Sequence, residues 1–241
     1  MLKKIVEKHQ FLKKELVGNP QGVKLVNAVS KLQWIETSYA LDGGNLTSEE
    51  IKEILDGRNL MDRTIRDHVM IRNYNKVVNN LYSAVGICDR VDHNLIKKVS
   101  MIFLADEVEA EPAEEFRKTV PIVSELDMIP MHPQEIQAEM EKMLQAYHSM
   151  HDKLDPVMRG CYVHNELLRI YPFAENNGAV ARAMLNFELL VAGYPPIPFT
   201  MDKRQYYDDV VSHIRDEDPE PFYLAVSKVL SQRLNQLIDL I

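Results

Sequence analysis

The sequence predicts an all-α protein built as one domain. Apolar residues recur at helical spacing, capping residues stand where these patterns begin, and glycine or proline stands where they end. Leu95, Val99 and Ile102, for example, share one face of a helix. The 241 residues are 46% hydrophobic, which suffices for a large core, and no segment is long enough to act as a linker. We therefore expect a single domain over residues 1–241.

Helix starts are marked by residues whose side chains accept hydrogen bonds from a first helical turn. Asn19 is followed by a proline, which suits the first helical position, and Thr47 with Glu50 forms a capping box. Asp62 and Asp92 are expected to cap two further helices. The expected helices cover residues 1–17, 20–41, 48–57, 62–81, 92–102, 132–150, 156–170, 178–193, 205–214 and 222–241.

One region breaks the helical pattern. Residues 115–131 carry Val120, Ile122 and Val123, with prolines at positions 121 and 130. Those prolines forbid a long helix and suit a short extended edge or a hairpin. We therefore expect a short β-hairpin here.

Composition narrows the classes of function. The net charge of −8 and the pI near 5.5 argue against nucleic acid as a general partner, because phosphate backbones bind basic surfaces. Residues 1–17 are basic but lack the continuous apolar run of a signal peptide, and no stretch approaches the ~18 apolar residues of a membrane span. Cys88 and Cys161 have no neighbouring ligand spacing and are expected to be reduced thiols. We expect a cytoplasmic protein that binds neither nucleic acid nor membranes.

The segment from Tyr171 to Arg182 has the features of an anion-binding loop. Its Asn-Asn-Gly run adopts positive φ angles at low cost, so successive N–H groups can converge beside the positive end of the next helix. Arg182, one turn into that helix, could reach the same anion. Glu175 could hold the divalent cation that polyphosphate chemistry generally needs. A helix cap with no ligand is the alternative interpretation of the same residues.

The same segment resembles, without a gap, the signature of the Fic family, H-x-F-x-(D/E)-G-N-G-R-x-x-R. Tyr171 replaces the family's histidine, Asn176 its first glycine and Ala179 its first arginine. The positions that match are Phe173, Glu175, Asn177, Gly178 and Arg182. Residues from about Trp34 to Val210 carry further similarities in the same order as the family.

The resemblance implies a Fic-like helical bundle with a short β-hairpin flap, which in the family lines up a target segment beside the nucleotide. Residues 115–122 resemble this flap. The residues assigned to it are Thr119, Val120, Pro121 and Ile122. The resemblance also implies a Fic core at about 62–200, between N-terminal helices in 1–57 and C-terminal helices in 202–241.

Fic proteins typically transfer AMP from ATP to a hydroxyl of a target protein, assisted by Mg²⁺. The resemblance therefore implies weak ATP and Mg²⁺ binding here and a target protein whose identity the sequence does not give. It assigns the metal to Glu175. It assigns the nucleotide phosphates to Asn176, Asn177, Gly178 and Arg182.

The catalytic position of the family is held by Tyr171, which is a poor base. A phenol with a pKa of ~10 is only about one part in a thousand ionised at neutral pH. Loss of a general base costs ~10²–10⁴ in rate, and loss of the arginine at Ala179 removes a contact worth roughly 1.5–3 kcal/mol. His164 lies two helical turns away, ~10 Å along the axis, and is expected to be structural. We expect weak transfer or none, with nucleotide binding retained.

A second element matches the inhibitory helix of many Fic proteins, (S/T)-x-x-x-E-(G/N). Ser38, Asp42 and Gly43 have this layout, with aspartate in place of glutamate. In the family the acid pairs with the second arginine of the signature, which here is Arg182. The alternative is a solvated Asp42 at a helix end that continues into a glycine turn.

Two other functions remain open. One is an active transferase with an altered base and donor, because a metal or an arginine can acidify a phenol such as Tyr171. The other is a non-catalytic interaction module whose loop binds nothing. The oligomeric state also stays open, and a homodimer is compatible with the sequence.

Overall fold

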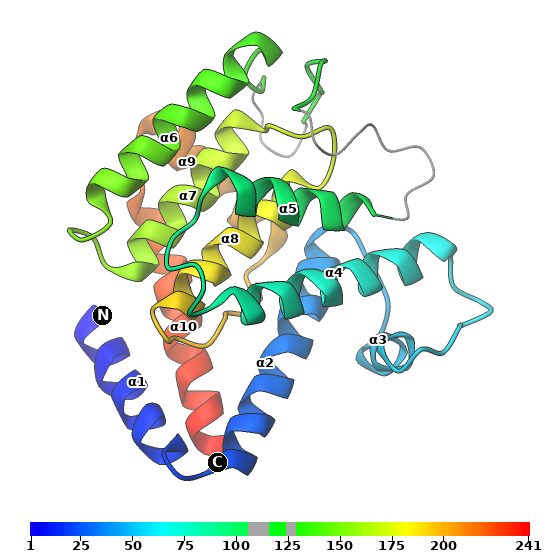
Figure 1. Ribbon diagram of the computed structural model, residues 1–241, viewed down its shortest axis with the longest axis vertical. Coiled ribbons are helices and arrows are strands. Elements are labelled where there is room, and N and C mark those ends of the chain that lie inside the picture. Colours follow the sequence, from blue (N-terminus) through cyan, green and yellow to red (C-terminus); the bar gives the residue numbers. More distant parts are fainter. Residues whose placement is uncertain (106–115, 124–128) are drawn as a thin grey trace.

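The computed structural model describes residues 1–105, 116–123 and 129–241, and these residues form an all-α structure (Figure 1), which confirms the predicted fold class. The helices are α1 (Leu2–Leu16), α2 (Pro20–Leu41), α3 (Ser48–Leu55), α4 (Ile65–Ala84), α5 (His93–Leu104), η2 (Pro133–Glu135), α6 (Ile136–Met150), α7 (Pro156–Ile170), α8 (Asn177–Val191), α9 (Lys203–Asp216) and α10 (Glu220–Leu240).

Most predicted helix starts are confirmed by the capping contacts. The Asn19 side chain accepts a hydrogen bond from the third residue of α2 at 2.8 Å, and Thr47 closes a capping box on α3. Asp92 caps α5 as expected. The prediction for Asp62 is wrong, because α4 starts two residues later, where Thr64 forms a reciprocal capping box with Asp67.

Helix α8 forms the centre of the bundle and packs along α7, with α4 and α5 on another side (Figure 1). All residues from Ala179 to Leu190 are buried. Such a helix must be apolar around most of its circumference, and the run AVARAMLNFELL meets this requirement. The few polar side chains within it, including Arg182, are therefore enclosed by the protein.

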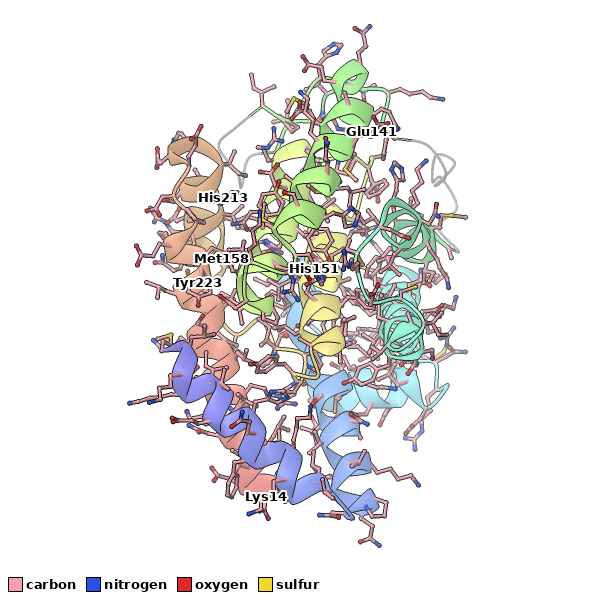
Figure 2. The ribbon with its side chains drawn as sticks, turned by 60° about the vertical axis from the view of Figure 1, so that its left-hand side comes forward. Lys14, Glu141, His151, Met158, His213 and Tyr223 are labelled. Atoms are coloured by element: carbon pink, nitrogen blue, oxygen red, sulfur yellow. The ribbon has the colours of Figure 1, made fainter. Side chains whose placement is uncertain are left out.

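The first and last helices, α1 and α10, pack against each other in one half of the molecule, beside α2 (Figure 2). Ile5 and Leu12 of α1 are buried, and Lys8 donates a hydrogen bond to the Ser231 hydroxyl of α10 at 2.8 Å. Arg233 of α10 donates to Gln33 and Ser30 of α2, and the far end of α2 reaches the loop between α7 and α8.

The predicted β-hairpin is not seen, because the described residues form no strand. Part of the expected hairpin, residues 115 and 124–128, lies outside the described residues. Within residues 116–123 the backbone N–H of Arg117 bonds to the carbonyl of Pro172 at 2.9 Å, and Pro121 has no N–H. Within its described part, this segment contacts the loop that follows α7.

None of the helices in the described part of the chain combines the length and the apolar character needed to cross a lipid bilayer.

Candidate functional site

The loop between α7 and α8 is held in shape by its own residues. Tyr171 ends α7 in the left-handed conformation, with φ at 52°, and Asn176 repeats this conformation with φ at 61° just before α8. The Asn177 side chain spans the loop, because it accepts from the N–H of Phe173 at 2.9 Å and donates to the carbonyl of Phe173 at 2.8 Å. These bonds occupy the Asn177 amide, so only the backbone N–H of this residue can serve an anion.

The first turn of α8 presents backbone donors to the loop. The Asn176 side chain makes no capping bond, and the first described bond in the ladder runs from the N–H of Val180 to the carbonyl of Asn176 at 2.9 Å. The preceding N–H groups belong to the first turn, where a helix supplies no acceptors and its dipole is positive. Such a first turn is able to accept an anion.

Gly178 is needed because of a neighbouring side chain rather than its backbone angle. A Cβ atom at this position would lie 2.9 Å from Nη1 of Arg182. The same atom would lie 3.9 Å from Oδ1 of Asp42. The missing side chain thus lets the guanidinium and the first turn of α8 approach the same point.

Arg182 is fully buried and pairs with Asp42, which decides between the two alternatives left open for that carboxylate. Its Nη2 lies 2.5 Å from Oδ1 of Asp42 and also donates to the Ser38 carbonyl at 3.3 Å. The hydroxyl of Tyr74 donates to Oδ2 of Asp42 and accepts from Arg182 at 3.1 Å. Nε and Nη1 of Arg182 make no regular hydrogen bond to the described residues, although the Tyr206 hydroxyl lies close enough to interact with the guanidinium. Buried donors without acceptors are rare in folded proteins and mark a position where a ligand can bind.

The groups around Arg182 keep its guanidinium protonated and positively charged. Burial alone would lower the pKa of its guanidinium, but Asp42, with Tyr74 and Tyr206, outweighs this, and the pKa lies well above its ordinary value. A charged and incompletely paired arginine is well suited to an anionic group with several oxygens.

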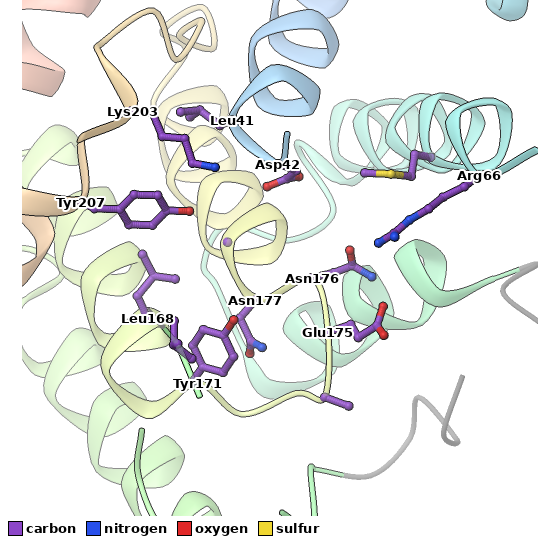
Figure 3. A pocket seen from close by; sticks show the side chains of 14 residues that line it. Leu41, Asp42, Arg66, Leu168, Tyr171, Glu175, Asn176, Asn177, Lys203 and Tyr207 are labelled. Atoms are coloured by element: carbon purple, nitrogen blue, oxygen red, sulfur yellow. The ribbon is translucent and has the colours of Figure 1, made fainter. Parts of the chain in front are cut away.

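A pocket of about 320 Å³ opens over this arrangement (Figure 3). Tyr171, Glu175 and Asn176 line it from the loop, and Asp42 from the end of α2. The pocket lining also includes three polar residues that the sequence analysis did not select: Arg66, Lys203 and Tyr207. Figure 3 shows Arg66 on the side of Glu175 and Asn176, and Lys203 on the side of Tyr207.

One sequence signal could have found two of these missed residues. Lys203 is the first residue of α9 and Arg66 the second residue of α4. The positive end of the helix dipole disfavours cations in a first turn. A basic residue at that position is therefore locally unfavourable, and such exceptions are typical of functional sites. Both cations line the pocket that an anion would enter.

The flap segment lies against the start of the loop through Arg117, whose side chain is buried. Its Nε donates to the Tyr171 carbonyl at 2.6 Å and its Nη1 to the Thr119 carbonyl at 2.6 Å. Its Nη2 donates to the carbonyls of Met131 and Ile170. Val123 of this segment lines the pocket, and Ile122 is 98% exposed. The assignment of Thr119 to Ile122 as a flap stays a prediction.

His164 is structural, as expected. It is fully buried and bonds to the Tyr206 hydroxyl at 2.6 Å and to the Asn165 side chain at 2.8 Å. Burial lowers the pKa of its imidazole to about 3, so the ring is neutral at ordinary pH. Its partners occupy both ring nitrogens, which leaves neither one to take a proton from a substrate.

Glu175 is exposed at the edge of the pocket. The described residues hold no cluster of three or more histidine, cysteine, aspartate or glutamate side chains that could bind a metal alone. Magnesium commonly binds through one or two carboxylates together with substrate phosphates, so one carboxylate suits a cation that arrives with a nucleotide. The buried free donors of Arg182 fit the phosphates themselves.

Comparisons with known proteins agree with this architecture. The family model described as Fic/DOC family matches residues 45–189, and the chain belongs to that family. The "Protein adenylyltransferase Fic" of Culex quinquefasciatus is 25% identical over 228 residues, which are 89% of this chain and 43% of the relative. This chain thus spans less than half the length of that curated relative.

Solved structures share the fold. A Fic domain containing signaling protein from Bacteroides thetaiotaomicron superposes with a TM-score of 0.84 at 22% identity, over 98% of this chain and 94% of that one. Fic-1 from C. elegans, residues 134–508, superposes with a TM-score of 0.80 at 21% identity, over 98% and 72% of the respective chains.

Proposed function

We propose that this Fic-domain protein binds the phosphates of ATP with Mg²⁺ and transfers AMP to a protein hydroxyl weakly or not at all. The observation that carries the proposal is the fully buried Arg182, which has two nitrogens without acceptors beside the open first turn of α8. The relatives named as protein adenylyltransferases support ATP as the nucleotide and a protein as the target. The predicted cytoplasmic location suits a protein that uses ATP.

In this proposal each residue of the pocket has one task. The N–H groups of Gly178 and Ala179 and the free nitrogens of Arg182 hold phosphate oxygens, which neutralises charge on the leaving group. Glu175 would hold Mg²⁺, which shields the phosphates when bound. Tyr171 stands where the incoming hydroxyl must lose its proton, and an ordinary phenol accepts protons poorly at neutral pH.

We further propose that Asp42 restrains the site. Its carboxylate lies on Nη2 of Arg182 and close to Gly178, where a phosphate oxygen would otherwise be held. Like charges repel, so a phosphate entering the pocket must displace Asp42 or accept a poorer position. The restraint lowers nucleotide affinity in addition to the low rate expected from Tyr171.

Calorimetric titration with ATP and Mg²⁺ tests binding. We expect weak binding by the natural chain and tighter binding after Asp42→Ala. Absence of heat with either protein at millimolar ATP would leave an interaction module that binds no nucleotide. Arg58→Ala, which changes an exposed charge outside the pocket, is the matched control and should bind as the natural chain does.

Labelled ATP tests transfer. The natural chain incubated with a cell lysate should label proteins at or near background, and Tyr171→His in an Asp42→Ala background should raise labelling by at least tenfold. Adding Asn176→Gly and then Ala179→Arg should raise it further, with thermal melting as a check because Ala179 is buried. Strong labelling by the natural chain that disappears in Glu175→Ala would instead establish an active transferase with altered chemistry.

A further inference from the structure

Three helices contribute one side chain each to the contact that covers Arg182. Asp42 comes from the end of α2, Tyr74 from the middle of α4, and Arg182 from the first turns of α8. The Tyr74 hydroxyl donates to one oxygen of Asp42, while Nη2 of Arg182 contacts the other oxygen at 2.5 Å and the Tyr74 oxygen at 3.1 Å. The three groups therefore form a closed triangle in which each contacts the other two.

We propose that Tyr74 is a positioning residue that holds Asp42 on Arg182 and thereby sets the affinity of the pocket for nucleotide. This inference rests on the proposed function, because it concerns the regulation of the same anion site. Tyr74 lies outside both the loop from Tyr171 to Arg182 and the segment from Ser38 to Gly43.

Among the described residues, Arg182 binds one oxygen of the Asp42 carboxylate and Tyr74 binds the other. It follows the last residue of α2, its side chain is 20% exposed, and the next residue, Gly43, turns the chain with φ at 91°. A carboxylate held through one oxygen only can still turn about that contact, although leaving the buried Arg182 unpaired is costly. The hydroxyl of Tyr74 binds the second oxygen and so makes the inward position the favoured one.

Tyr74 is itself rigid and keeps its proton. Its side chain is 2% exposed, and its ring packs edge to face against Phe103 with the centroids 4.9 Å apart. Burial, together with the negative charge of Asp42, raises the pKa of its phenol well above the ordinary value. The hydroxyl is thus a permanent donor in a fixed place, which is what holding a carboxylate requires.

Removing the hydroxyl should favour the nucleotide-bound state. With Tyr74→Phe, Asp42 loses its second contact and leaves Arg182 more readily, so a phosphate meets less competition. We expect ATP with Mg²⁺ to bind about tenfold more tightly to this variant, a factor typical of one hydrogen bond to a charged group. Asp42→Ala should give at least the same gain, and Tyr74→Phe added to Asp42→Ala should give no further gain.

Tyr147→Phe is the matched control. Tyr147 is a buried tyrosine whose hydroxyl also donates to a carboxylate, that of Glu188, but it does not line the pocket. This variant should lose stability without a change in ATP affinity. Urea unfolding of the four proteins of the Tyr74 and Asp42 cycle supplies a second readout that needs no nucleotide, and the two substitutions should be non-additive by about fivefold or more in the unfolding constant.

The outcomes separate this inference from the proposed function. If Asp42→Ala tightens ATP binding but Tyr74→Phe does not, or if Tyr74→Phe acts equally with Asp42 absent, the positioning role is overturned. Additive unfolding effects would also overturn it. If none of the proteins binds ATP while the unfolding cycle shows coupling, the proposed nucleotide function fails and the hold of Tyr74 on Asp42 stands.

Discussion

Two buried arginines lie against opposite ends of the loop between α7 and α8, and they are satisfied in different ways. Arg117 contacts the start of the loop, and each of its side-chain nitrogens donates to a backbone carbonyl. Arg182 lies just past the end of the loop. It uses one nitrogen for Asp42, Tyr74 and a carbonyl, and leaves the other two without acceptors.

The difference separates a structural arginine from a binding one. Arg117 links the end of α7 to Thr119 and Met131 by donating to backbone carbonyls. These acceptors are fixed parts of the main chain, so the hydrogen bonds of Arg117 stabilise the fold and do not bind a ligand. Arg182 is held instead by a single carboxylate, that of Asp42, and two of its nitrogens make no hydrogen bond to the described residues. Burial alone therefore does not reveal the role of an arginine, and its acceptors must be compared as well.

The largest expected effect is on stability at the start of the loop. Arg117→Ala leaves the buried carbonyl of Ile170 and the half-buried carbonyl of Tyr171 without this donor, and unsatisfied buried groups cost about 1–3 kcal/mol each. We expect the free energy of unfolding in urea to fall by about 3 kcal/mol or more. Arg58→Ala, on the surface, should change it by less than about 0.5 kcal/mol. Equal losses in both variants would show that Arg117 is not a structural centre.

The next effect concerns binding at the end of the loop. Arg182→Lys keeps the charge but removes the two free donors, so ATP affinity measured by calorimetry should fall by about tenfold or more. Arg159→Lys is the control, because Arg159 is also buried but bonds to Glu188 and to backbone carbonyls away from the pocket. It should lower stability and leave ATP affinity unchanged. A similar loss of affinity in both variants would refute the special role of Arg182.

A third effect follows from His164, whose pKa is lowered to about 3 first by burial and also by the charge of Arg182. In the unfolded chain this imidazole has a pKa of ~6.5, so below that pH the unfolded state binds a proton that the folded state does not. Stability should therefore fall as the pH drops from about 6.5 toward 3, by up to about 1.4 kcal/mol per pH unit from this residue. His164→Gln should show a shallower slope in urea unfolding between pH 6.5 and pH 5. An unchanged slope would mean that His164 is protonated in the folded state.

The smallest effect concerns the two cations outside the Fic signature. Arg66→Ala and Lys203→Ala should each weaken ATP binding by about two- to fivefold, because exposed charges contribute roughly 0.2–1 kcal/mol. The losses should shrink at high salt, which screens exposed charges. Arg204→Ala, the neighbour of Lys203 on α9, does not line the pocket and should have no effect. An effect of Arg204→Ala equal to that of Lys203→Ala would indicate attraction by net charge alone.

The sequence was most informative where structure depends on neighbours within one turn. The caps at Asn19, Thr47 and Asp92 are confirmed because a capping side chain bonds to an N–H two or three residues away. The error at Asp62 is also a local one, because the capping box that starts the helix is at Thr64, only two residues further on. The expected hairpin is not seen in the described residues, where Arg117 donates to the carbonyls of Ile170, Tyr171 and Pro172, contacts that no local pattern reveals.

The sequence by itself determined the all-α class, most helix starts and the left-handed Asn176, because each depends on short-range backbone preferences; Asn177 and Gly178, also expected at positive φ, belong to α8 instead. Only the tertiary structure decided that Asp42 meets Arg182, 140 residues away, with Tyr74 between α2 and α8. It also placed Arg66 and Lys203 at one pocket. Contacts between helices depend on how their buried faces pack together, and a pattern read along one chain does not contain that geometry.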